Sequence, residues 1–207
     1  MIPTPEKVVP VIAPVALPIW ASLRKGLAFA DELQPDPADR EGFFWAHSAR
    51  YMARKELLKA NTQPGVEGWA VRGNVPNCGI HLLLDDLHKI RVVRSFGGTT
   101  PHPGRNPRRR ADWKGIQGAV QDQFVLDTEA ELPPLSLIVD WTDQDGEPVV
   151  HIGLPRGEWG YQKSPSLHWR VRLPEAETDL AGLRFEAADD GGGVLPIDRS
   201  EFVADDR

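Results

Sequence analysis

The chain has 207 residues, of which 41% are hydrophobic and 26% are charged, and its net charge is −6. A chain of this size and composition buries enough apolar surface to fold without a disulfide or a structural metal. Its single cysteine, Cys78, excludes an intramolecular disulfide, so we expect a cytoplasmic protein. The acidic balance argues against a domain that is basic throughout, as dedicated nucleic-acid-binding domains usually are.

The charge is distributed unevenly along the chain. Residues 88–119 contain eight lysines and arginines and one acid, Asp112, whereas residues 120–207 contain seven basic and nineteen acidic residues. Residues 1–87 are nearly balanced, with nine basic and ten acidic residues. A basic segment within an acidic chain suits an anionic partner, and this asymmetry is the clearest functional indication in the sequence.

Residues 8–20 are apolar, and within them a proline recurs at every fourth position, at Pro10, Pro14 and Pro18. Proline interrupts helical hydrogen bonding, so this spacing argues against the helical core of a signal peptide. No apolar run approaches the roughly 18 residues that span a bilayer, so we expect no membrane association. We predict an extended, Pro-rich arm over 1–18 that packs on the domain or on a partner.

Two helices are expected after this arm. Apolar residues recur at the helical period through 19–33, and Pro35 ends that segment. A second apolar stripe runs through 41–60, with Asp39 as the expected N-cap and Pro64 beyond the end.

The rest of the chain favours strands. We expect strands at 69–72, 80–84, 89–95, 135–141, 149–154, 167–173 and 183–185. The 80–84 and 89–95 strands form a hairpin in this interpretation, although the first half of that run also fits a helix. The segment 95–110 is too rich in proline and glycine for regular structure, and 112–126 fits a short helix. We therefore predict a single α+β domain over 19–200, with N-terminal helices packed on a mainly antiparallel sheet, and an acidic tail over 201–207.

The basic loop at about 94–114 is the main candidate site. Guanidinium groups are permanently charged donors that match phosphate oxygens, and a neighbouring tryptophan offers a ring on which a base could stack. The predicted contacts are Arg94, Arg105, Arg108, Arg109, Arg110, Trp113 and Lys114. The sequence favours a non-enzymatic binding or accessory protein for an anionic partner, either nucleic acid or an acidic protein, with nucleic acid preferred. The alternative, a solvated loop that neutralises the acidic half of the same chain, stays open.

A metal or cofactor site is not predicted. His81, Asp85 and His88 would share one face of a helix and could then bind a metal, but a hairpin separates them. Cys78 lies three residues before His81, and no second cysteine–histidine pair of the zinc-site form accompanies it.

Two other functional classes stay open. The familiar hydrolase, nucleotide-binding and metalloprotease motifs do not occur in the sequence, so an enzyme is not favoured. A hydrolase or nuclease would need histidines such as His151 or His168 to meet Asp140 across the sheet. A protein–protein interaction module would use the Pro-rich arm and the loop around Trp159 as contacts.

Overall fold

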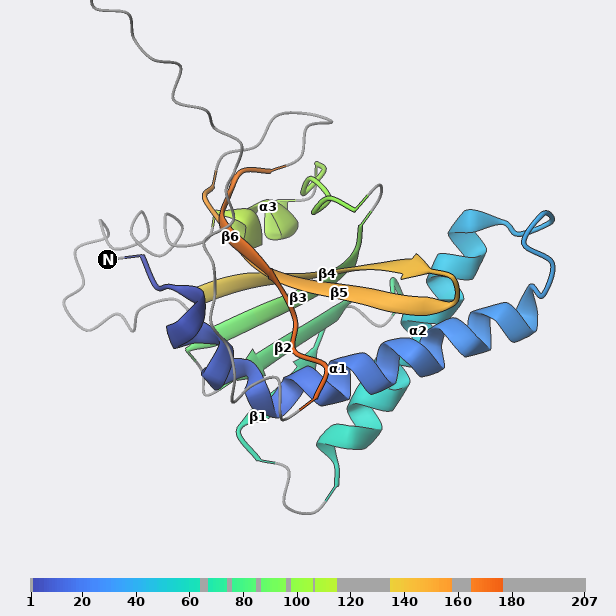
Figure 1. Cartoon of the computed structure of the whole chain (residues 1–207), viewed down its shortest axis with the longest axis horizontal. Helices are drawn as coiled ribbons and strands as arrows, with labels where there is room; N and C mark the ends of the chain where they lie inside the picture. The colour runs from blue at the N-terminus through green and yellow to red at the C-terminus, as the bar shows by residue number, and fades with distance from the viewer. Residues whose placement is uncertain are drawn as a thin grey trace, which may run out of the picture.

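The computed structural model describes residues 2–63, 67–73, 76–84, 87–95, 98–105, 107–114, 135–157 and 165–176. Its elements in chain order are α1 (Pro5–Leu33), α2 (Gly42–Asn61), β1 (Trp69–Arg72), β2 (Ile80–Leu84), β3 (His88–Arg94), α3 (Pro107–Trp113), β4 (Leu135–Gln144), β5 (Glu147–Pro155) and β6 (Leu167–Arg172). N-terminal helices accompany a six-stranded, mainly antiparallel sheet (Figure 1), which confirms the predicted α+β class.

The sheet follows chain order from β1 to β6. Neighbouring strands are antiparallel except β3 and β4, which run parallel with Ile90 opposite Leu137. A parallel pair needs a crossover, and α3 forms part of it. The β4–β5 hairpin turns at Asp145 and Gly146, with φ of 55° and 84°, as a two-residue Asp-Gly turn requires. The two strands therefore extend beyond the predicted 135–141 and 149–154.

Helix α1 shows that the predicted extended arm is wrong for residues 5–18. The helix begins at Pro5 and continues through the three later prolines. Pro10 and Pro14 are exposed, on the face opposite the buried stripe. Each proline leaves unpaired the carbonyl four residues earlier, and this spacing keeps those carbonyls on the same outward face, where water can bond them. The buried stripe is Val8, Ile12, Val15, Ile19 and Leu23; its burial outweighs the proline penalty.

Helix α1 is also long and apolar enough, by length and composition, to cross a membrane. In this structure half of its most apolar 18-residue window is buried, as in the core helix of a globular fold. The expectation of no membrane association therefore stays a prediction.

Replacing Pro10 and Pro14 by alanine should stabilise the protein. Proline within a helix costs about 3 kcal/mol relative to alanine, and because these carbonyls face water we expect a gain of about 1–2 kcal/mol for the double variant. The measurement is the free energy of unfolding in urea, with Pro35→Ala, beyond the end of α1, as the control. An extended arm would instead lose stiffness with these changes, so a fall in stability would contradict the continuous helix.

The two faces of the sheet are covered by different helices (Figure 1). Helices α1 and α2 pack on one face, over a core that includes Leu82, Ile90, Leu137, Val139 and Ile152. They approach closely at Gly26, where an added Cβ would lie 2.4 Å from the carbonyl oxygen of Ala49. On the other face, Trp113 of α3 packs with Val93 and Ile138.

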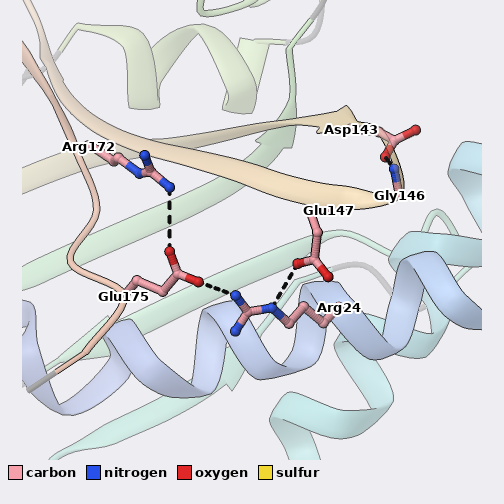
Figure 2. A network of polar contacts seen from close by, with 6 residues as sticks. All are labelled: Arg24, Asp143, Gly146, Glu147, Arg172 and Glu175. Carbon is pink, nitrogen blue, oxygen red and sulfur yellow. Dashed lines mark hydrogen bonds and ion pairs between the residues drawn. The ribbon is translucent and has the colours of Figure 1, made fainter.

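Helix α1 is also tied to the sheet by polar contacts (Figure 2). Arg24 donates to Glu147, at the start of β5, at 3.0 Å and to Glu175, beyond β6. These two carboxylates raise the pKa of Arg24. The indole Nε1 of Trp20 donates to Leu173 O at 3.2 Å, and the Arg24 guanidinium lies 5.5 Å from the centre of that ring. The N-terminal helix is thus anchored to the last part of the chain that the structure describes.

Several predictions for the chain lie outside the described residues: the strand at 183–185, the Trp159 loop, the helix beyond residue 114 and the tail at 201–207. Among the described residues, the 80–84 and 89–95 hairpin is confirmed by β2 and β3, and α2 begins and ends within one residue of the predicted 41–60. The N-cap of α2 is Glu41 rather than Asp39.

Candidate nucleic-acid interface

A groove of about 1370 Å³ opens where the first half of α2, the β1–β2 turn, strands β2 and β3 and the segment 101–111 meet. Six cationic side chains line it: Arg50, Lys89, Arg91, Arg94, Arg105 and Arg109. Among the described residues that line it there is no aspartate or glutamate. We call this feature the basic groove.

The structure brings together three of the predicted contacts, Arg94, Arg105 and Arg109, in the lining of the basic groove. Arg110 is exposed and its Nε donates to Gly104 O at 2.9 Å, while Lys114 is exposed in the turn after α3. The side chain of Arg108 lies outside the described residues.

Helix α3 corrects the expectation of irregular structure up to residue 110. The helix begins at Pro107, a residue suited to the first helical position because it has no N–H to leave unpaired there. Of the helix predicted at 112–126, only residues 112 and 113 lie in α3, and its part beyond residue 114 lies outside the described residues. Arg108, Arg109 and Arg110 therefore lie on a helix packed against the sheet rather than on an open loop.

The predicted stacking of a base on Trp113 is wrong. The ring is fully buried beneath α3, and its Nε1 donates to Pro101 O at 3.0 Å. The guanidinium groups of Arg109 and Arg91 lie 5.0 and 6.0 Å from the ring centre. The buried Trp113 ring therefore makes cation–π contacts with two arginines of the groove and offers no surface to a ligand.

Arg94 reaches the groove from the other face of the sheet. Its guanidinium lies 4.7 Å from the centre of the Trp45 ring, and its Nη1 donates to Gly42 O at 3.5 Å. Burial lowers the pKa of Arg94, an effect that Asp143 opposes and Arg50 reinforces. Strand β3 thus presents cations on both of its faces, because alternate side chains point in opposite directions.

Like charges crowd one another in the groove. Burial lowers the pKa of Arg50. Burial and then the neighbouring charges of Arg91 and Arg50 lower the pKa of Arg109. Part of the charge is compensated by Asp112 of α3, which is buried and pairs with both Lys89 and Arg91. An anion in the groove would relieve the remaining repulsion, which is a physical reason for the groove to bind one.

His81 lines the groove without adding charge. Burial and then Arg91, its partner across the β2–β3 ladder, lower the pKa of His81 to about 4, so the ring is neutral at pH 7. His88 lies at the opposite end of the hairpin, opposite Leu84, and Asp85 lies outside the described residues. No cluster able to hold a metal ion occurs within the part of the chain that the structure describes.

Sequence reasoning missed a second wall of the groove, formed by α2 and the β1–β2 turn. Phe43 is 75% exposed, and its ring lies 6.1 Å from that of His47 at an interplanar angle of 21°. His47 Nε2 lies 3.5 Å from the sulfur of Cys78, which is 3% exposed and has a φ of 49°. The available signal was the i, i+4, i+7 spacing of Phe43, His47 and Arg50, which places them on one face of a helix.

His151 and Asp140, which a hydrolase would need to bring together, lie on neighbouring strands with an arginine between them. Asp140 lies opposite His151 in the β4–β5 ladder, and Arg170 Nη2 lies 2.7 Å from Asp140 Oδ1 and 3.0 Å from His151 Nδ1. Thr100 donates to Asp140 Oδ2 at 2.6 Å. Burial and then Arg170 lower the pKa of His151.

This geometry differs from that of a hydrolytic triad, in which a carboxylate accepts the N–H of the histidine. Here the guanidinium of Arg170 lies next to the ring nitrogen of His151 and forms an ion pair with the carboxylate of Asp140. The arrangement ties β4, β5, β6 and Thr100 together.

Comparisons with protein-family models, with curated proteins and with solved structures find no match to this chain. The function of the basic groove is therefore inferred from its own residues.

Proposed function

We propose that the protein is a non-enzymatic binding or accessory protein that holds an anionic partner, nucleic acid, in the basic groove. The observation that carries this proposal is the convergence of six cationic side chains on one groove whose described lining contains no acid. These cations come from α2, β3, the turn before α3 and α3 itself, so several elements of the fold, and not one loop, assemble the charge.

The size of the groove favours an extended ligand. At about 1370 Å³ it exceeds the 300–1,000 Å³ of pockets that enclose drug-sized molecules. Several consecutive phosphates fit such a groove, and guanidinium groups bind phosphate oxygens in bidentate fashion. Each phosphate contact releases condensed counterions, so binding should weaken steeply with salt.

The test is a salt titration of the parent and of an Arg50→Gln/Arg105→Gln double variant, using a fluorescent oligonucleotide of mixed sequence. For two lost phosphate contacts we expect the slope of log K against log salt to flatten by about 1.4–1.8, and the affinity to fall about tenfold or more. The change should be the same for different sequences, because phosphate contacts do not read bases.

The matched control is Lys7→Gln/Lys59→Gln, which removes the same charge from exposed positions that do not line the groove. This variant should keep the parent slope and affinity. The proposal fails if the groove and control variants behave alike, or if the parent binds no oligonucleotide at micromolar concentration. Tighter binding of polyglutamate than of the oligonucleotide would assign the groove to an acidic protein instead.

A further inference from the structure

The exposed aromatic ring on the wall of the basic groove has no role in the electrostatic proposal above. Phe43 lies in the first turn of α2, lines the groove, and leaves three quarters of its surface to solvent. A single exposed aromatic residue is common in proteins. What distinguishes this one is its place beside the cations and the support behind it.

The ring of Phe43 is held in position by a chain of contacts. The imidazole of His47 packs against it with nearly parallel planes, and His47 is in turn held by the sulfur of Cys78. Cys78 is buried in the turn before β2, so a second element contacts the imidazole against which the Phe43 ring stacks. A ring that is already oriented loses little conformational freedom when a flat ligand packs against it.

We propose that the basic groove is a single-strand site, in which one unpaired base stacks on Phe43 while the neighbouring cations contact the backbone. This inference rests on the proposed function and specifies its ligand class. Arg50 lies on the same face of α2, seven residues after Phe43, so that a base and its adjacent phosphate meet one helix face. Basic grooves with aromatic platforms bind single strands in this manner and tolerate different base sequences.

Duplex nucleic acid cannot use the platform in the same manner. Its bases are stacked on each other within the helix, and offering one to Phe43 would require unpairing and unstacking. Duplex would contact only the cations. A preference for single strands should therefore depend on Phe43, whereas the salt dependence should depend on the arginines.

The experiment compares a 12-nucleotide single strand with the blunt duplex of the same sequence, using the full chain and its Phe43→Ala, Phe43→Trp and Phe44→Ala variants. We expect Phe43→Ala to weaken single-strand binding about 5- to 100-fold with an unchanged salt slope, and to leave duplex binding within twofold. Phe43→Trp should retain single-strand affinity, and its fluorescence should be quenched when the strand binds. Phe44, which is 44% exposed but does not line the groove, provides the control and should stay within twofold of the parent.

The inference is overturned if Phe43→Ala binds the single strand as the parent does, or if the parent binds duplex as tightly as the single strand. If either result occurs while the Arg50→Gln/Arg105→Gln variant still shows a reduced salt slope, the electrostatic proposal stands and only the stacking site is removed. If the parent binds neither nucleic acid, both proposals fail.

Discussion

Replacing Asp140 by alanine should lower the free energy of unfolding by about 3–5 kcal/mol, the cost of removing one partner from a buried ion pair. The side chain of Asp140 is 1% exposed and accepts hydrogen bonds from Arg170 and from the hydroxyl of Thr100. Its loss leaves a guanidinium and a buried hydroxyl without their acceptor. Equilibrium urea unfolding, followed by circular dichroism, measures the effect.

The control for Asp140→Ala is an ion pair at the surface. Lys25→Ala breaks the Lys25–Glu56 pair, in which the lysine side chain is 60% exposed, and should cost less than about 1 kcal/mol. Asp140→Asn retains the shape and one acceptor, so it should be milder than Asp140→Ala. A loss below about 1 kcal/mol for Asp140→Ala would show that the network of Asp140, Arg170 and Thr100 does not stabilise the fold.

The sheet was largely predictable because its signals are local. Runs of β-forming apolar residues marked the strands, and an Asp-Gly pair, Asp145 and Gly146, closes the β4–β5 turn. The second half of α1 was predicted as a helix over 19–33, but its first half was not, because the local effect of three prolines was given more weight than the apolar stripe that runs through them. The helix forms because the stripe is buried against α2 and the sheet, and this tertiary packing outweighs the local cost of the prolines. Pro10 and Pro14 lie on the exposed face of the helix, where the carbonyls that they leave unpaired can bond to water.

The positive charge of the basic segment could be predicted from the sequence, but the shape of the groove and the residues that line it could not. Trp113 follows directly on the arginine cluster, and the sequence does not indicate whether its ring faces solvent or the sheet. The other wall of the groove comes from α2, about sixty residues earlier, and the turn at Cys78. The parallel crossover from β3 through α3 brings these segments together, and no local pattern specifies that pairing.

Asp112 both stabilises the fold and reduces the positive charge of the groove. Its replacement should therefore lower the free energy of unfolding and raise the affinity for an anionic ligand. Asp112→Asn removes the carboxylate that pairs with Lys89 and Arg91, both of which line the groove. Because Lys89 remains about one third exposed, we expect a loss of stability of about 2–4 kcal/mol. The two released cations should raise the affinity for a single-stranded oligonucleotide about fivefold at low salt and steepen the salt slope.

The measurement pairs urea unfolding with oligonucleotide binding at a temperature at which circular dichroism shows the variant folded. Glu56→Gln removes one negative charge from α2 outside the groove and serves as the control, with small effects on both stability and affinity. Weaker binding by folded Asp112→Asn would mean that the Asp112 pairs hold Lys89 and Arg91 in the positions that a ligand needs. Tighter binding by a less stable protein would instead show that the fold keeps a carboxylate beneath the groove at the expense of affinity, and that the groove's positive charge is what an anionic ligand contacts.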